Sequence, residues 1–408
     1  MARFRDDDQD GRIEEPAESE YKARRVRGED AFSDTPEEET TTSRGRRFAD
    51  DFPEEDEPAP KKKKKKGGVI LWIILIVAIL VLLGSGGMVV WEMLVQPAMN
   101  DSMNDEIRAL AGAVTEVEDE PIDFDALRAV NSDIVGWIKV PNTVINYPVL
   151  QSSASDPEYY LYRDYKKNDT KYGSVFLDAG ASIHRGDKNA KSLTLYGHHM
   201  NDGRMFAEIL KYDNLDFFKR TPTFKFDTYE ETGTWKVISI FKTNVLKSQG
   251  EVFQYVRNGF SNDEDFLDFV HNIMIRSIIN TGVKVNEDDQ LLVLSTCSYE
   301  FNDFRTVLVA RRVRDGEDKT VDVAAAAYNN APLYPDVWYG NGGNKPIYPQ
   351  TFKEAQAQQL TYWYDGDGLF DTPSVAPTSD AKDDGSSAAE DDDVPEEELS
   401  YDDTQNDV

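Results

Sequence analysis

The chain has 408 residues, enough for two or three domains of average size. Its formal net charge is -31. That charge gathers at the two ends: residues 1–60 carry about -10, residues 315–408 about -18, and everything between them only about -3. Because no basic stripe remains outside one lysine run, nucleic-acid binding is excluded as a function class. The folded part of the chain is therefore expected in the nearly neutral middle.

The first 60 residues are rich in Asp, Glu, Arg, Ser, Thr and Pro and show neither helical nor strand periodicity. A segment of this kind cannot bury enough apolar surface to offset the entropy of ordering its backbone. The lysine run Lys61 to Lys66 closes it. We predict that residues 1–66 form a disordered tail.

A long apolar stretch follows the lysines. Val69 to Leu83 contains no polar residue, and the pattern resumes after a short Gly/Ser interruption and continues to Trp91. About 23 apolar residues are enough to cross a hydrocarbon core of about 30 Å. A cleavable signal peptide would begin near the N-terminus, and a buried core helix is rarely this long without a charge. We therefore predict a transmembrane helix over residues 67–92.

The lysine run sets the expected orientation of this helix. Basic residues favour the cytoplasmic side of a membrane span. The tail of residues 1–66 is then cytoplasmic, and everything after Trp91 lies outside the cell.

Beyond the span, scattered apolar residues between Glu92 and Val117 suit an amphipathic helix. From about Ile122 to Val313, strand patterns dominate, interrupted by predicted helices at Phe124–Val130, Met205–Leu210 and Glu264–Ile279. Eight strands spread over about 190 residues indicate a closed barrel or a sandwich. These predicted strands are Ile134–Val140, Val144–Leu150, Ser174–Leu177, Ser192–Tyr196, Thr223–Asp227, Thr234–Thr243, Leu291–Thr296 and Arg305–Val313.

The chain changes character again after Arg314. Residues 323–370 keep many aromatic side chains, which suggests a small appendage on the barrel or a surface that binds a cell-wall component. From Thr372 onward Asp, Glu, Ser and Pro prevail, which is typical of disorder. We expect residues 316–408 to be an acidic, partly aromatic and largely disordered extension.

Cys297 is the single cysteine, and it ends the apolar run Leu291-Leu292-Val293-Leu294-Ser295-Thr296. This run predicts a buried strand that delivers a thiol to its C-terminal edge. A lone cysteine has no partner for an intramolecular disulfide, so it is either a small core residue or a reactive group. A reactive thiol needs a neighbour that accepts its proton or stabilises the thiolate.

The chain offers four histidines as that neighbour. His271 lies within a predicted amphipathic helix, and His184 lies in a polar loop, so packing or solvent contact explains both. His198 and His199 follow the strand that ends at Tyr196, and they occupy the same kind of strand-end position as Cys297. A structural or solvated role remains the alternative for them.

Arg305 lies eight residues after Cys297, at the start of the next predicted strand. If the two strands are neighbours, its guanidinium lies close to the thiol, where it favours the thiolate and can donate hydrogen bonds to an oxyanion. The alternative is an ordinary salt bridge to Glu300 or Asp303.

These residues together resemble a known family. The run Tyr196-Gly197-His198-His199-Met200, with Leu294-Ser295-Thr296-Cys297 and Arg305, resembles the active-site set of the sortases, the membrane-anchored cysteine transpeptidases of Gram-positive bacteria. Class B is the subtype resembled. The supporting segments, over about residues 93–314, are the opening Phe124–Ile138, Tyr147–Gln151, Gly173–Asp178 and the helix Glu264–Ile279 before the cysteine strand.

The resemblance implies a mostly β fold: an eight-stranded sortase-type barrel with an N-terminal helix and an inserted long helix, preceded by one transmembrane helix. The catalytic domain would span residues 93–315. Cys297 would attack the sorting signal, His198 would hold the thiolate as an ion pair and protonate the leaving amine, and Arg305 would stabilise the oxyanion. His199 stands where Asn is common in the family and receives no catalytic role. The expected groove-lining residues are Tyr196, Ser295 and Thr296.

The implied partners are secreted proteins with a C-terminal sorting signal, an amine of a peptidoglycan precursor or of a pilin, and the membrane. No cofactor and no metal are expected. The main rival is a cysteine hydrolase or another cell-wall transpeptidase with a similar Cys/His pair. In those families the nucleophile commonly precedes its histidine, whereas here His198 comes first. Two more hypotheses compete with wall anchoring. One is a pilin-polymerising sortase, and the second is a catalytically inactive membrane-tethered scaffold, which the presence of His198, Cys297 and Arg305 together opposes.

One motif in the tail stays ambiguous. Tyr348-Pro349-Gln350-Thr351 resembles the Pro-Gln-Thr core of signals favoured by some class B enzymes, but no apolar span follows it. Either the match is a coincidence, or the segment is a pseudosubstrate that lies in the groove.

Overall fold

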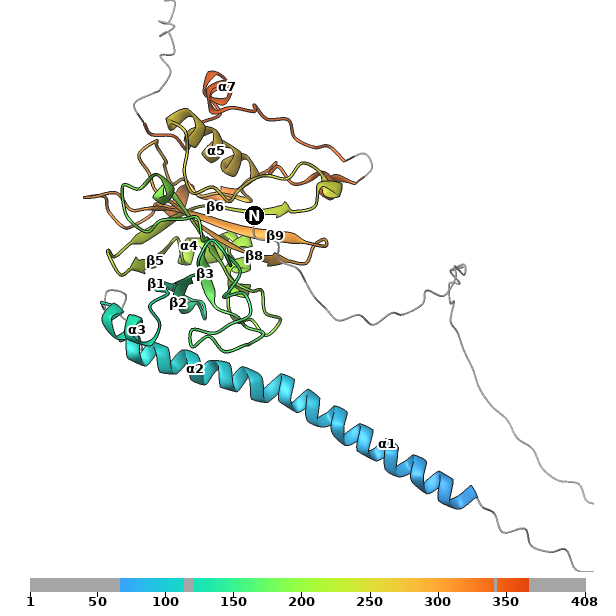
Figure 1. Ribbon diagram of the computed structural model, residues 1–408. Coiled ribbons are helices and arrows are strands. Elements are labelled where there is room, and N and C mark those ends of the chain that lie inside the picture. The colour runs from blue at the N-terminus through green and yellow to red at the C-terminus, as the bar shows by residue number, and fades with distance from the viewer. Residues whose placement is uncertain (1–66, 114–120, 341–342, 367–408) are drawn as a thin grey trace, which may run out of the picture.

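The computed structural model describes residues 67–113, 121–340 and 343–366. The expectations for the tail of residues 1–66 and for the acidic residues after Gly366 lie outside this part. Figure 1 shows a long N-terminal helix that leads into a β-barrel, and a C-terminal extension that lies over the opposite side of the barrel.

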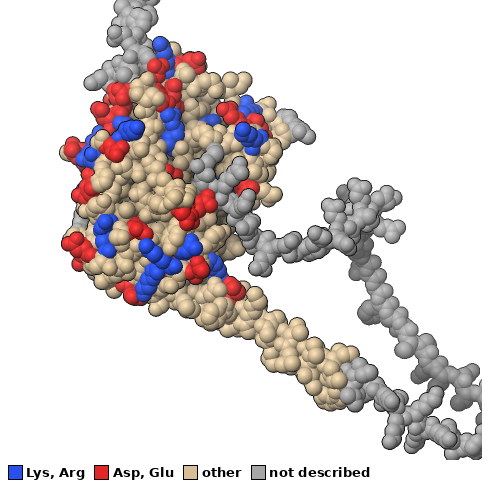
Figure 2. Space-filling model, viewed as in Figure 1, with Lys and Arg blue, Asp and Glu red and all other residues tan. Residues whose placement is uncertain are grey.

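The N-terminal helix contains α1 (Gly67–Val90), a π-helical turn (Trp91–Val95) and α2 (Gln96–Ala111). At 1.5 Å per residue, α1 alone is about 36 Å long. Its apolar side chains are exposed from Leu71 onward, and it carries no charged residue, as the uniformly tan rod in Figure 2 shows. By length and composition this is one helix able to cross a membrane.

Three ion pairs tie this helix to the barrel, at Glu92, Asp101 and Glu106. Their partners are Lys171 at 2.5 Å, Arg204 at 2.6 Å and Lys166 at 2.7 Å. Apolar residues of α2 and of α3 (Phe124–Val130) also pack against the barrel in one buried cluster. Asp123 caps α3, because its side chain accepts a hydrogen bond from the Ala126 N–H over 2.9 Å. The predicted helix Phe124–Val130 is therefore present.

Eight strands close into a barrel in the order β1-β2-β3-β4-β8-β9-β6-β5, which confirms the predicted eight-stranded fold. Most neighbouring strands are antiparallel, but β2 pairs with β3 and β4 pairs with β8 in parallel. The barrel strands are β1 (Ile134–Lys139), β2 (Asn146–Gln151), β3 (Val175–Leu177), β4 (Ser192–Tyr196), β5 (Thr223–Thr228), β6 (Thr234–Asn244), β8 (Leu291–Ser298) and β9 (Phe304–Arg312).

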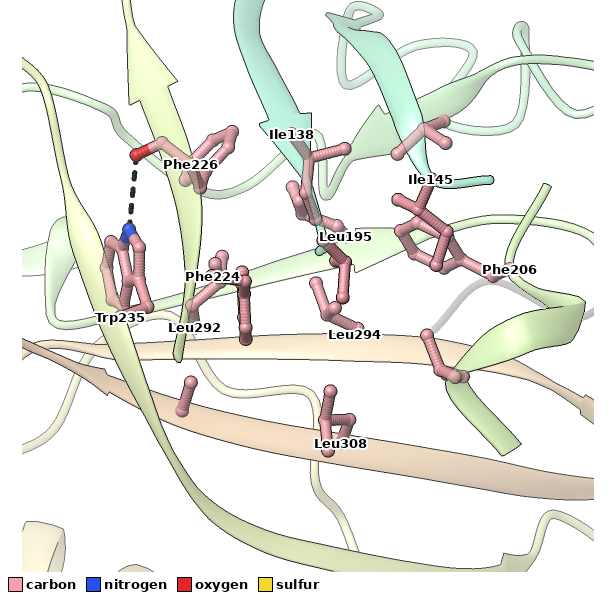
Figure 3. Close-up of a cluster of buried hydrophobic side chains, with 14 of the residues drawn as sticks. Ile138, Ile145, Leu195, Phe206, Phe224, Phe226, Trp235, Leu292, Leu294 and Leu308 are labelled. Carbon is pink, nitrogen blue, oxygen red and sulfur yellow. Dashed lines mark hydrogen bonds between the residues drawn. The ribbon is translucent and has the colours of Figure 1, made fainter. Parts of the chain in front are cut away.

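Alternate side chains of these strands fill the barrel interior (Figure 3). Leu292 and Leu294 point inward from β8, and Leu308 meets them from β9. The buried indole N–H of Trp235 has a hydrogen-bond partner, because Nε1 donates to the Phe226 carbonyl over 3.1 Å (Figure 3). Since strand side chains alternate between faces, the odd-numbered residues of β8 and β9 lie on the outer face of the barrel.

A long helix covers that outer face. Helix α5 (Asp263–Arg276) lies over β6, β8 and β9, and its aromatic and aliphatic residues form one buried cluster with Val293, Val307 and Val309. Asn262 caps its start by accepting from the Asp265 N–H at 2.9 Å. The sequence predicts this helix up to Ile279, but it ends three residues earlier because Ile279–Asn280 form the short strand β7.

Two shorter helical segments follow β4. The predicted helix at Met205–Leu210 is instead a 3-10 segment at Ala207–Asp213, and α4 (Leu215–Arg220) comes after it. Residue Asn214 ends the first and caps the second, since its side chain accepts from the Asp216 and Phe217 N–H groups.

The extension forms short regular elements in its described residues up to Gly366. Its β10 (Ala327–Tyr328) pairs with β7, and α6 (Asp336–Tyr339) and α7 (Phe352–Ala357) follow. Phe352 and Trp363 are buried in the same cluster as the apolar residues of α5. The aromatic residues that are unusual for a linker thus complete the apolar cover of the barrel's outer face.

Candidate active site

The parallel pairing of β4 and β8 carries both candidate strand ends to one edge of the barrel. Tyr196 and Ser295 are register partners. Beyond them the Gly197 N–H donates to the Ser295 carbonyl over 3.2 Å, and Thr296 Oγ1 donates to the Gly197 carbonyl over 2.7 Å. His198 and Cys297 each lie two residues past that register pair, so the structure brings them to the same end of neighbouring strands.

Arg305 reaches the same edge from the other side of Cys297. The two are register partners across β8 and β9, and both belong to the outer face. Arg305 is buried, and its Nη1 donates to the Phe304 carbonyl over 2.9 Å, whereas Cys297 is partly exposed and forms no disulfide. Glu300, one of the two carboxylates considered as a salt-bridge partner for Arg305, pairs with Lys242 at 3.1 Å.

The ring of His198 is held by the loop between β2 and β3. Its Nε2 lies 2.7 Å from the Leu161 carbonyl, and its ring centroid lies 5.3 Å from that of Tyr162. Because a carbonyl only accepts, Nε2 carries the proton in this arrangement. Gly173 makes room for that carbonyl: it has φ +56, and a Cβ atom there would lie 2.1 Å from the Leu161 oxygen.

His199 joins the two strand ends instead of facing away. Its Nδ1 donates to the Cys297 carbonyl at 2.9 Å, and its own carbonyl accepts from the Tyr299 hydroxyl at 3.0 Å. The two rings lie 4.7 Å apart. The sequence did not reveal this role, because a second histidine beside a candidate base looks redundant until the strand pairing is known.

The three residues predicted to line the groove are all buried. The Tyr196 hydroxyl donates to Asp178 over 3.0 Å, and burial, together with that carboxylate, raises the pKa of Tyr196. Ser295 Oγ is 2.9 Å from the Tyr255 hydroxyl, and Thr296 bonds to the Gly197 carbonyl as described. Their contact with substrate stays a prediction.

Tyr255 is a site residue that sequence reasoning missed. It lies in the irregular segment between β6 and α5, where no periodicity marks it. Burial raises the pKa of this tyrosine, the Ser295 hydrogen bond opposes that rise, and its hydroxyl also senses the charges of Arg305 and Cys297. The Tyr255 side chain therefore places a neutral hydroxyl near the Cys297 thiol and the Arg305 guanidinium.

The β8–β9 loop that links Cys297 to Arg305 is held by Lys242 of the neighbouring strand β6. Lys242 is buried in β6 and pairs with Asp213 at 2.8 Å as well as with Glu300. The same ammonium donates to Thr306 Oγ1 at 2.8 Å. Burial raises the pKa of Asp213, although the neighbouring Lys242 opposes that rise.

The Pro-Gln-Thr segment of the tail lies against α5. The Pro349 carbonyl is 3.0 Å from His271 Nε2, and the Gln350 backbone N–H donates to Glu354 over 3.0 Å. Burial lowers the pKa of His271, so this imidazole is a neutral structural donor. This position accounts for the segment as part of the extension's packing and gives no support to a pseudosubstrate role.

Among the residues that the structure describes, no group of three His, Cys, Asp or Glu side chains is arranged to hold a metal ion. The chemistry at this edge of the barrel is that of a thiol, an imidazole, a guanidinium and neutral hydroxyls.

Comparison with known proteins places this chain in one family. Residues 138–313 match the sortase domain family. The chain is 33% identical to Sortase B of Listeria monocytogenes over 224 residues, 54% of this chain and 86% of that protein. It is 34% identical to Sortase B of Staphylococcus aureus over 194 residues, 47% of this chain and 75% of that protein.

Solved structures give related matches. A Staphylococcus aureus sortase B–substrate complex is 28% identical and covers 54% of this chain and 99% of that one, with a TM-score of 0.48. A sortase B of Bacillus anthracis is 30% identical and covers 54% and 100%, with a TM-score of 0.46. The match to the sortase domain family and to the two Sortase B proteins identifies the fold as that of a sortase. The chain belongs to the sortase B family of cysteine transpeptidases, as the motifs predicted.

Proposed function

We propose that this transpeptidase cleaves a sorting signal near the C-terminus of secreted proteins, holds the acyl group as a thioester on Cys297, and passes it to an amine of a cell-wall precursor. One observation carries the assignment of the nucleophile. The parallel register of β4 and β8 brings His198 and Cys297 to the same end of neighbouring strands, while the antiparallel register of β8 and β9 pairs Arg305 with Cys297 from the other side. A thiol flanked in this way has both partners that acyl transfer requires.

The nucleophile in the proposed reaction is the Cys297 thiolate. A free thiol has a pKa of about 8.5, so at neutral pH only a small fraction is ionised. The buried guanidinium of Arg305 on the neighbouring strand favours the anion. A protonated His198 on the other side adds a second positive charge.

The proton is carried by His198. Its Nε2–H donates to the Leu161 carbonyl, an arrangement that also stabilises the charged ring, since an imidazolium donates from both nitrogens. Proton exchange with the substrate then falls to Nδ1. The thiolate adds to the carbonyl carbon of the signal, the C–N bond breaks, and the leaving amine takes the proton from His198.

The second half of the reaction reverses these steps. The acceptor amine adds to the thioester carbonyl and gives its proton to His198, and the C–S bond breaks to release the thiolate. Both tetrahedral intermediates carry an oxyanion. Arg305 is the charged donor placed to stabilise it, and removal of one such donor typically costs a factor of about 10² to 10³ in rate.

For the location of the enzyme, we propose that α1 spans the membrane with the lysine run inside and the barrel outside. The apolar length of α1 and the lysines that precede it support this orientation. The single cysteine makes the test direct, because a membrane-impermeant maleimide added to intact cells should label Cys297. Labelling that appears only after lysis would overturn the orientation.

The test of the chemistry uses the full-length protein with a library of sorting-signal peptides. Cys297→Ala and His198→Ala should each abolish the thioester adduct seen by intact-protein mass spectrometry. His184→Ala is the matched control, since His184 is an exposed imidazole paired with Glu230 on another part of the surface. Turnover that persists in Cys297→Ala would sink the proposed mechanism.

A further inference from the structure

A buried lysine lies inside the barrel at the end that carries the candidate active site. Lys242 is 3% exposed, and on β6 it follows Ile240 of the barrel interior by two residues. Since strand side chains alternate between faces, both point inward. Burying a charge is costly, and well-packed apolar side chains in place of a buried ion pair often leave a protein equally stable or more stable. The need to fill the core therefore does not explain this lysine.

Two of the groups that Lys242 contacts are close in sequence to candidate catalytic residues. Its ammonium pairs with Glu300 of the β8–β9 loop at 3.1 Å, and Glu300 comes three residues after Cys297. It also donates to Thr306 Oγ1 over 2.8 Å, and Thr306 directly follows Arg305. One ammonium thus holds both the loop that follows the thiol and the strand that carries the guanidinium.

The third contact of the ammonium reaches the part of the chain that follows His198. Lys242 pairs at 2.8 Å with Asp213, the last residue of the 3-10 segment Ala207–Asp213. Just before that segment, the Phe206 N–H donates to the His198 carbonyl over 2.9 Å. An ammonium has three N–H donors. Here those three donors are matched by acceptors from three different segments.

The inner face of the barrel carries a row of buried polar groups that begins at Lys242. Thr306 is the register partner of Lys242, and Thr296 is the register partner of Thr306. Both threonines are fully buried, and Thr296 Oγ1 donates to the Gly197 carbonyl over 2.7 Å. We call these four residues the polar row. Each candidate catalytic residue is the direct chain neighbour of one of its members: Arg305 of Thr306, Cys297 of Thr296, and His198 of Gly197.

We infer that Lys242 is a positioning residue for the thioester chemistry: it holds the polar row and the β8–β9 loop in place, and thereby keeps the Arg305 guanidinium at the Cys297 thiol. The inference rests on the proposed function. Lys242 acts through its neighbours, because it lies on the inner face of the barrel, whereas Cys297 and Arg305 belong to the outer face. A misplacement of about 1 Å in an active site can cost roughly 10²-fold in rate.

Lys236 is the matched control for this role. It lies on the same strand, it is also buried, and its ammonium pairs with Glu317 at 2.7 Å. Its register partner on β9 is Arg311, at the opposite end of the barrel from Arg305. A general loss of stability should therefore follow from either lysine, whereas a loss of positioning should follow only from Lys242.

The first experiment compares the two lysines in the full-length protein in detergent micelles. Lys242→Met removes the charge and nearly keeps the length of the side chain. In single-turnover reactions with a sorting-signal peptide, the maximal rate of thioester formation should fall roughly tenfold to a hundredfold, while the peptide concentration at half-maximal rate changes by less than about twofold. Lys236→Met should lower the melting temperature and leave the rate unchanged. An unchanged rate in Lys242→Met, or an equal fall in Lys236→Met, would overturn the inference.

The second experiment needs no substrate, so it does not depend on the sortase mechanism. The rate at which iodoacetamide alkylates Cys297 rises with pH as the thiol ionises, and the midpoint of that rise is measured. The variant Asp213→Asn/Lys242→Met/Glu300→Gln removes one positive and two negative charges. Because the whole ion-pair cluster is neutralised, this variant avoids the large penalty of leaving one buried charge without its partner.

The triple variant separates positioning from a direct effect of charge. On balance it loses one negative charge, which by itself would lower the midpoint of Cys297 alkylation. Displacement of Arg305 would instead raise the midpoint toward about 8.5, the ordinary value for a free thiol. We expect the midpoint to rise, and a midpoint at or below that of the native protein would refute the positioning role. A missing thioester in the native protein would refute the proposed function, whereas the alkylation midpoint would still test the placement of Arg305.

Discussion

His199 donates a hydrogen bond from Nδ1 to the backbone carbonyl of Cys297 over 2.9 Å, across 98 residues of sequence. The bond closes the edge where β4 and β8 end, because the Gly197 and Thr296 bonds hold the same two segments one and two residues earlier. The residues before and after His198, Gly197 and His199, are therefore both hydrogen-bonded to β8. The distance from His198 to the thiol is set by the sheet and not by a free loop.

His199→Ala should lower the rate of thioester formation about tenfold, because the link to the Cys297 carbonyl is lost while Cys297, His198 and Arg305 remain. The lost bond should cost about 1 kcal/mol of unfolding free energy. His199→Asn retains a donor and should recover most of the rate. Single-turnover kinetics with a sorting-signal peptide checks both variants; equal losses in the two would show that the imidazole itself matters.

Gly173→Ala should damage the site through Leu161. A Cβ atom at this position would lie 2.1 Å from the Leu161 carbonyl oxygen, the group that holds His198 Nε2. The positive φ adds about 1–2 kcal/mol for any L-residue. We expect a lower melting temperature and a fall in kcat.

The matched control for this change is Gly186→Ala. Gly186 has φ +96, but a Cβ atom there meets nothing within 4 Å. It should therefore share the backbone cost and keep the activity. Full activity in Gly173→Ala would mean that the Leu161 carbonyl does not position His198.

Trp338→Ala should loosen the loop between Cys297 and Arg305. The indole stacks on Tyr334 at 4.1 Å and lies 5.8 Å and 6.3 Å from the rings of Phe301 and Phe304, at the end of that loop. Removing a half-buried indole should cost about 2 kcal/mol of unfolding free energy. Hydrogen exchange of the loop amides should speed up, and kcat should fall.

Two variants separate loop packing from general stability. Trp338→Phe retains a ring and should recover most of the loop protection. Trp363→Ala removes a buried indole from the cluster that contains α5 and should destabilise the protein without selectively speeding exchange in the β8–β9 loop. The positioning role would be refuted if loop exchange were the same in Trp338→Ala and Trp363→Ala.

Acid should weaken the attachment of the extension. Burial raises the pKa of Glu317, but hydrogen bonds from Arg311 and Lys236 outweigh it and hold the pKa well below the ordinary 4.5. A carboxyl with a depressed folded pKa stabilises the fold above its unfolded pKa, and that contribution is lost as the pH falls below about 4.5. Thermal unfolding at pH 7 and pH 4 should show this loss in the native chain. In Glu317→Gln the loss of stability between pH 7 and pH 4 should be smaller than in the native chain. An equal loss in the two proteins would exclude Glu317 as a source of the acid sensitivity.

Much of the fold is readable from the sequence because the barrel strands are short, β-branched and bounded by turn residues. The approach of His198 to Cys297 cannot be read from the sequence, because it depends on parallel pairing between strands that lie about a hundred residues apart in the chain. Tyr255 and the Leu161 carbonyl lie in irregular segments and act through hydrogen bonds that no periodicity marks. The aromatic residues of the extension suggest packing on the barrel, but the sequence does not show which of them are buried; Phe352 and Trp363 belong to the cluster that also contains the apolar residues of α5.

The ion pairs of Glu92, Asp101 and Glu106 have a consequence for how the enzyme meets its substrates. Because α1 continues through the π-helical turn into α2, and ion pairs fasten both the turn and α2 to the barrel, the proposed span and the barrel turn together. Spans tilt to match the thickness of the bilayer. Lipid composition would then set the angle at which the Cys297 edge faces the membrane surface, and so which amines come within its reach.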